Sequence, residues 1–168
     1  MKMKETLTTD YIDQSFSASD QSLPPNIKSQ CKGWKRPSPD SVVLKDGKAG
    51  MSVRQGSIGD CYLISAIGAL GRDRIKQILG DPSSYPAGAY MVKFNKFNRD
   101  IHVIVDSQFP VFSNDAANQW LFGRSEDEKE LFCNIIEKAY AKLYGGYQNI
   151  VGGKVALALS EMTGGFPE

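Results

Sequence analysis

The chain has few cysteines, one histidine and no long hydrophobic run. Its three cysteines, Cys31, Cys61 and Cys133, are odd in number and widely spaced, with no Cys-x-x-Cys pair. This excludes a disulfide framework and a zinc site of the usual spacing. No apolar stretch approaches the roughly 18 residues of a membrane-spanning helix, and we expect no signal peptide. These absences predict a cytoplasmic protein in a reducing compartment, without a membrane span.

A marked excess of one charge is also missing. Lysine and arginine number 20 against 19 acidic residues, a formal net charge of +1. Proteins that bind nucleic acid or acidic membrane surfaces usually carry a basic excess, so we predict neither partner. The 168 residues suffice for one domain with a buried core.

The first part of the chain differs in composition from the rest. Residues 1–30 are polar, with serines clustered before a Pro-Pro pair, and predict an extended N-terminal arm with little structure of its own. Residues 31–168 are expected to form the folded unit. Three apolar residues are candidates for pinning the arm to it: Tyr11, Ile12 and Phe16.

Gln55–Leu70 is the stretch around which we expect the fold to be organised. It begins as a glycine-punctuated loop and becomes, after Asp60, apolar on nearly all sides. Asp60 is a favourable N-cap whose side chain can accept from backbone N–H groups, and a helix that is apolar all round belongs inside a domain. Cys61 then lies in the first turn, where the helix dipole favours a thiolate. The pattern predicts a central helix with a candidate nucleophile at its N-terminus.

Two interpretations of Cys61 compete. Most unpaired cysteines are small buried hydrophobes, so a plain core residue is the simpler one. Gly56 and Gly59, however, allow a tight turn and the close approach of another segment. Gln55, earlier in the same loop, can bring a side-chain amide beside the sulfur. A backbone N–H at Cys61 and the Gln55 amide are the donors of an oxyanion hole, which favours acyl transfer by a thiolate.

The segment Gln-Gly-x-x-Gly-Asp-Cys-(aromatic)-Leu resembles the active-site segment of the calpains, papain-like cysteine proteases of the cytoplasm. Further agreements follow in the order in which the family has them and cover roughly residues 34 to 165. They are Trp34–Pro37, Tyr90–Phe94, Asp100–Pro110, Glu137–Lys142, Gly145 with Tyr147, Gly152-Gly153 and Thr163–Gly165. The resemblance implies an α+β fold, the papain-like N-terminal subdomain, mostly helical with a central Cys-bearing helix and a small antiparallel β-hairpin.

Hydrophobic periodicity predicts the hairpin and a second helix independently. Ala89–Phe97 and Ile101–Val105 form two runs separated by a turn, and the second alternates between buried and polar positions. Ser125–Tyr144 predicts a helix that starts with a Ser-x-x-Glu capping box and ends at Gly145-Gly146. Cys133 falls off its apolar stripe and is interpreted as incidental.

The catalytic base is not found in this sequence. The single histidine, His102, lies in the middle of a predicted strand on its polar side, and the calpain histidine does not come from this strand. A papain-like mechanism needs a histidine to take the thiol proton and usually an asparagine to orient it. In the family both belong to a second, mainly β subdomain across the cleft. We expect this second subdomain to be absent here and the isolated chain to be inactive.

The resemblance also implies substrate and metal contacts. Gly152 and Gly153 do not have the spacing of a phosphate loop. The matching glycines of calpains present backbone to a protein or peptide substrate in extended conformation. A calcium ion is implied at four positions, Lys45 and Gly47 through backbone oxygens, Ser52 and Glu130. Ser52 stands where the family has Asp, and the loss of this carboxylate weakens the expected site.

Together these features predict the N-terminal half of the catalytic domain of a calpain-like cysteine endopeptidase, a thiol protease that works with a second subdomain in a longer chain. The alternative is a naturally truncated, non-catalytic calpain-like protein that binds or regulates through the same cleft. A purely structural module is disfavoured, because a core helix needs neither Gln55 nor the glycine pair.

Overall fold

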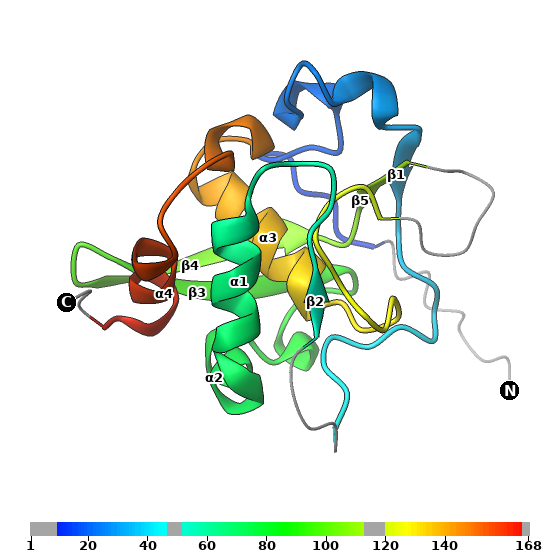
Figure 1. Ribbon diagram of the computed structural model, residues 1–168. Helices are drawn as coiled ribbons and strands as arrows, with labels where there is room; N and C mark the ends of the chain where they lie inside the picture. The colour runs from blue at the N-terminus through cyan, green and yellow to red at the C-terminus, as the bar shows by residue number, and fades with distance from the viewer. Residues whose placement is uncertain (1–9, 47–51, 113–119, 166–168) are drawn as a thin grey trace, which may run out of the picture.

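The computed structural model describes residues 10–46, 52–112 and 120–165 of the chain. Four α-helices occur in this part: α1 (Cys61–Ala69), α2 (Gly71–Ile78), α3 (Phe132–Leu143) and α4 (Val155–Thr163). The strands are β1 (Gly33–Lys35), β2 (Val53–Arg54), β3 (Ala89–Lys96), β4 (Arg99–Asp106), β5 (Phe109–Val111) and β6 (Arg124–Ser125). Helices α1 and α3 lie at the centre, and the β3–β4 hairpin passes beside them (Figure 1). The fold is α+β, as predicted.

Helix α1 is the buried helix that the sequence predicts. Leu63, Ala66 and Ile67 have no measurable exposure, and the helix packs against α3, α4 and β2. Gly71, with a left-handed φ of 71°, ends it and starts α2 in a new direction. The central placement of α1 is confirmed.

The expected β-hairpin is present, and its two strands, with eight residues each, are longer than the other strands of the described chain. β3 and β4 pair antiparallel from Ala89↔Asp106 to Lys96↔Arg99. Phe97 and Asn98 form the turn with φ of 53° and 57°, the backbone of a type I′ turn that matches the twist of the strands. Two further short pairs, β1 with β5 and β2 with β6, were not predicted. In the described residues the structure therefore combines four α-helices with three small antiparallel sheets.

The predicted start of the long helix is wrong. Ser125 lies in β6 and pairs with Val53 of β2, so it caps no helix. Helix α3 begins only at Phe132, with no side-chain cap at its N-terminus. Pairing with a distant strand has overridden the local Ser-x-x-Glu signal, which is the usual limit of capping motifs read from sequence alone.

The interpretation of Cys133 in α3 as an incidental residue is also wrong. The helix is buried along most of its length, so Cys133 is fully enclosed and is part of the core. Its C-terminus is as predicted: Gly145 has φ of 86°, and the Gly146 N–H donates to the Ala141 carbonyl at 2.8 Å.

Two segments at the ends of the described chain pack onto this core. Phe16, Leu23 and Ile27 are buried, whereas Ile12 is 56% exposed and does not pin the N-terminal segment. Helix α4 was not predicted; it packs on α1 and β3 and ends at a left-handed glycine, Gly164.

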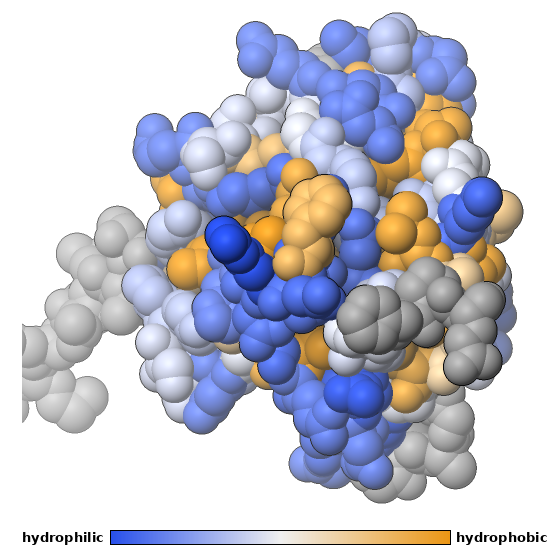
Figure 2. Space-filling view, turned by 90° about the vertical axis from the view of Figure 1, so that its left-hand side faces the viewer, coloured by the Kyte–Doolittle hydropathy of each residue, from blue (hydrophilic) through white to orange (hydrophobic). Residues whose placement is uncertain are grey.

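The surface that carries α4 and the tip of the β3–β4 hairpin is mainly hydrophilic, with separate hydrophobic areas (Figure 2). Large apolar side chains on exposed positions in this part of the chain are Phe97, Val151, Val155 and Leu157. No helix in the described ranges has the length and hydrophobicity to span a bilayer.

Candidate functional site

Cys61 is the most accessible of the three cysteines. It is the first residue of α1 and is exposed, whereas Cys31 is partly covered and Cys133 is buried. Burial raises the pKa of the Cys133 thiol well above its ordinary value, which makes that thiol a poor nucleophile. The geometry therefore leaves Cys61 as the thiol best placed to meet a substrate.

The loop before Cys61 is held by a hydrogen bond within the loop and by contacts with the segment around residue 121. Nε2 of Gln55 donates to the Ile58 carbonyl at 2.7 Å, and the Ser57 N–H donates to the Leu121 carbonyl at 2.9 Å. A Cβ on Gly56 would lie 2.3 Å from backbone atoms of Phe122, so only glycine fits there. The loop that carries Gln55 is thus fixed against the segment around residue 121.

The predicted substrate-binding glycines meet this loop. The Gly152 N–H donates to the Gly59 carbonyl at 2.8 Å, and Gly152 has a left-handed φ of 72°. A Cβ on Gly153 would lie 2.6 Å from the Tyr62 ring. Gly153 therefore has a packing role that sequence reasoning missed, since only the fold brings the Tyr62 ring against it.

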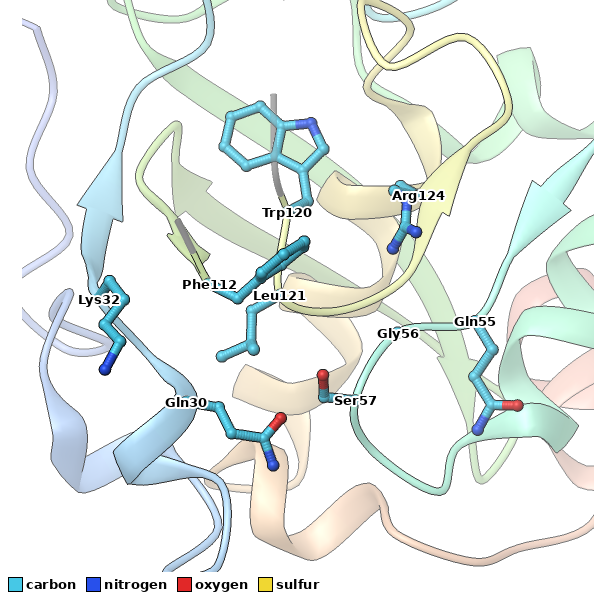
Figure 3. A pocket seen from close by; sticks show the side chains of 9 residues that line it. All are labelled: Gln30, Lys32, Gln55, Gly56, Ser57, Phe112, Trp120, Leu121 and Arg124. Carbon is cyan, nitrogen blue, oxygen red and sulfur yellow. The ribbon is translucent and has the colours of Figure 1, made fainter. Parts of the chain in front are cut away.

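A pocket of about 400 Å³ lies beside the same loop (Figure 3). Gln55 and Gly56 lie at one edge and Gln30 with Lys32 at the opposite edge, with Leu121 between them (Figure 3). The complete lining is Gln30, Lys32, Gln55, Gly56, Ser57, Phe112, Trp120, Leu121 and Arg124. The pocket combines apolar surface with two cationic side chains.

Asp60, the predicted N-cap, makes no capping hydrogen bond. It is fully buried, and no backbone N–H group in the described residues donates to its carboxyl oxygens. It faces Glu137, whose two carboxyl oxygens each lie 3.0 Å from the Gly123 N–H. Burial, and then the facing carboxyl of Asp60, raise the pKa of Glu137 well above its ordinary value, and burial raises the pKa of Asp60 as well.

The prediction that Asp60 caps helix α1 is therefore wrong, because its carboxyl is paired with that of Glu137. Two buried carboxyls that face each other are costly to ionise together, so the pair retains a proton at a higher pH than exposed carboxyls do. Asp60 is thereby turned into the core, under the first turn of α1, where it cannot reach the backbone N–H groups that an N-cap serves.

His102 is an exposed strand residue, as predicted. It lies in β4 opposite Lys93. The sequence holds no other histidine.

Two of the positions expected to bind calcium, Lys45 and Glu130, contact the Arg72 side chain in the described part of the chain. The Lys45 carbonyl accepts a hydrogen bond from Arg72, and the Glu130 carboxylate lies 3.6 Å from the Arg72 guanidinium. Ser52 offers no carboxylate, and Gly47 lies outside the described residues. No cluster of three or more metal-ligating side chains occurs in the parts of the chain that the structure describes. Of the described positions, Lys45, Ser52 and Glu130, only Glu130 offers a carboxylate, whereas a hard divalent cation such as calcium prefers several negatively charged oxygens.

Comparisons with known proteins identify the family of this chain. Residues 11–168 match the family described as calpain family cysteine protease. Calpain-5 of Caenorhabditis elegans is 32% identical over 171 residues, which cover 94% of this chain and 26% of the relative. Calpain-5 of Mus musculus is 33% identical over 179 residues, with the same coverages.

A plant relative extends the comparison. The calpain-type cysteine protease DEK1 of Arabidopsis thaliana is 31% identical over 190 residues, covering 100% of this chain and 9% of the relative. The chain thus spans about a quarter or less of the length of these relatives. With the family match over nearly its whole length, the chain belongs to the calpain family of cysteine proteases.

Proposed function

We propose that the chain is the N-terminal half of the catalytic domain of a calpain-like cysteine endopeptidase, with Cys61 as nucleophile and Gln55 as oxyanion donor. The observation that carries this proposal is the exposed Cys61 thiol at the start of a buried helix, behind a loop held by its own hydrogen bond and by the segment around residue 121. A core cysteine would need none of this arrangement.

The chemistry follows from the donors at this helix start. The Cys61 thiolate attacks the carbonyl carbon of a peptide bond, and the resulting oxyanion accepts from the Cys61 N–H and the Gln55 amide. The first N–H groups of a helix have no intrahelical partner. Gln55 uses one N–H of its amide on the Ile58 carbonyl, and the second remains for the oxyanion. The histidine of the second subdomain takes the thiol proton and returns it to the leaving amine, and water then hydrolyses the thioester.

The substrate is a protein or peptide in extended conformation. The loop of Gly152 and Gly153 offers backbone without side chains next to Gly59, a surface on which extended chains pair. The pocket beside Gln55, with cationic Lys32 and Arg124 at its walls, suits a substrate side chain that carries an acceptor or a negative charge. A second subdomain in a longer cytoplasmic chain supplies the histidine and asparagine.

The alternative function is a non-catalytic calpain-like binding protein. It is favoured by one observation, the position of the single histidine on the exposed hairpin strand and outside the residue set around Cys61. Both functions use the same cleft, and only the supply of a base distinguishes them.

We expect the isolated chain to show no peptidase activity above background, because one missing member of a catalytic unit removes most of its effect. The test uses a fluorogenic peptide and two proteins, the chain alone and the chain joined to a subdomain carrying the calpain histidine and asparagine. Turnover is expected only in the joined protein, and Cys61→Ser is expected to abolish it.

Two controls make the result decisive. Cys133→Ser, at a thiol that is buried and so closed to substrate, should retain turnover if the joined protein stays folded. Gln55→Ala should lower kcat by about 10²–10³-fold, as removal of one oxyanion donor does elsewhere. Activity of the isolated chain that depends on Cys61 would refute the missing base, and turnover that survives Cys61→Ser would refute the nucleophile.

A further inference from the structure

Arg72 reaches two of the oxygens that the family resemblance assigns to a calcium ion. It is the second residue of α2, directly after the left-handed Gly71. Its Nη1 donates to the Lys45 carbonyl oxygen, and its Nη2 lies 3.6 Å from Oε1 of Glu130. One cationic side chain therefore joins the segment around Lys45 to the residues that precede α3.

The bridge is largely enclosed. The Glu130 side chain is 2% exposed and that of Arg72 is 15% exposed. A buried carboxylate requires a partner of opposite charge, and removing that partner is strongly destabilising. The guanidinium suits both acceptors, because its planar set of N–H donors can serve a carbonyl and a carboxylate at once.

The neighbouring carboxylates of this segment are also paired with side-chain cations. Lys45 forms an ion pair with Asp127, and Nζ of Lys76 lies 3.1 Å from Oδ1 of Asp46. Calcium binding needs six to eight oxygen ligands with a surplus of negative charge. Here Glu130, the one carboxylate in the implied ligand set, already faces a guanidinium, and Asp127 is paired with Lys45.

The backbone holds the same segment in place. The Val42 N–H donates to the Lys129 carbonyl at 2.8 Å, and the Leu131 N–H donates to the Val42 carbonyl at 2.9 Å. The segment leading to Lys45 is thus paired with the chain around Glu130 before any ion is considered.

We propose that Arg72 is a built-in replacement for a structural calcium ion, so that this subdomain holds the Lys45 segment against Glu130 without calcium. This inference depends on the proposed calpain-like function in one point only, because the resemblance to calpains tells us where a calcium ion is expected. Its consequence is regulatory: the packing of this subdomain does not respond to calcium concentration.

The first test is thermal unfolding of the unmodified chain in EGTA and in millimolar CaCl2, with MgCl2 as the ionic-strength control. The Tm is expected to be the same in all three, because no ligand binds the folded state preferentially. A calcium-specific rise in Tm that EGTA reverses and Glu130→Gln abolishes would overturn the proposal.

The second test restores the missing carboxylate with and without the arginine. Ser52→Asp alone should leave the Tm independent of calcium, whereas Ser52→Asp combined with Arg72→Ala should give a calcium-dependent rise in Tm. Arg72→Ala alone should lower the Tm by about 5–10 °C, because Glu130 loses its partner.

The proposal can still be tested if the Ser52→Asp, Arg72→Ala double variant does not fold, because the Ser52→Asp single variant is informative by itself. Calcium-dependent stabilisation of Ser52→Asp with Arg72 in place, lost on adding Glu130→Gln, would show that the guanidinium does not occupy the position of the ion. All readouts are Tm values of the chain itself, so they stand or fall separately from the peptidase test of the joined protein.

Discussion

Replacing Lys138 by methionine is expected to lower the free energy of unfolding by about 3–5 kcal/mol, the cost of leaving a buried carboxylate without its partner. Lys138 has no exposed side-chain surface, and its Nζ donates to Oδ1 of Asp106 at 2.6 Å and to the Gln108 carbonyl at 2.5 Å. Asp106 also accepts from the Asp13 N–H at 3.0 Å. The lysine therefore ties α3 to the end of β4 and to the N-terminal segment.

The matched control is Lys93→Met, the same chemical change at a surface ion pair. Nζ of Lys93 lies 3.8 Å from Oδ2 of Asp100, and both side chains are substantially exposed, so we expect a change of about 1 kcal/mol or less. Urea unfolding followed by circular dichroism measures both variants. Equal losses in the two would contradict the assigned role of Lys138.

Ile64→Asp is expected to prevent folding at 25 °C or to leave an aggregated product. Ile64 is 5% exposed in α1, and its Cδ1 packs where a Cβ on Gly123 would lie. The new carboxylate would be buried near the Asp60–Glu137 pair, and the cost of about 4 kcal/mol or more approaches the whole stability of a typical domain, ~5–15 kcal/mol.

Ser65→Asp is the control for this substitution, one position along the same helix and exposed. It should change the unfolding free energy by no more than about 0.5 kcal/mol. Soluble expression and far-ultraviolet circular dichroism compare the two variants. A soluble, cooperatively unfolding Ile64→Asp protein would show that α1 is not the centre of the fold.

Local sequence patterns were enough for the parts of the fold that local physics decides. The apolar circumference of Cys61–Ala69 places this helix in the core, and the alternation around His102 produces a strand with one buried face. The hairpin and the glycine end of α3 follow from the same short-range rules.

The remainder depends on contacts between distant segments. Ser125 reads as a helix start, but it pairs with Val53, more than 70 residues away. Asp60 reads as an N-cap, but Glu137 of α3 faces it inside the core. Arg72 carries no local signal for its contact with Glu130. Each outcome requires the tertiary arrangement, which local patterns in a single sequence do not supply.

The candidate site also has features that could be predicted from the sequence and features that could not. The motif around Cys61 could be found because its glycines and its glutamine have no role in a plain core helix. The packing of Gly153 on Tyr62 could not be found, because the two residues are brought together only by the loop that pairs Gly152 with Gly59.

The most direct measurement of the central claim, that Cys61 is a presented nucleophile, is the order in which the cysteines are alkylated in the folded chain. Iodoacetamide at neutral pH followed by peptide mapping should modify Cys61 well before Cys133, whose thiol is buried and whose pKa is raised. Modification in denaturant, where all three cysteines should react, supplies the control. A folded chain in which Cys61 stays unmodified while Cys133 reacts would contradict the account, because Cys61 would then be a core residue.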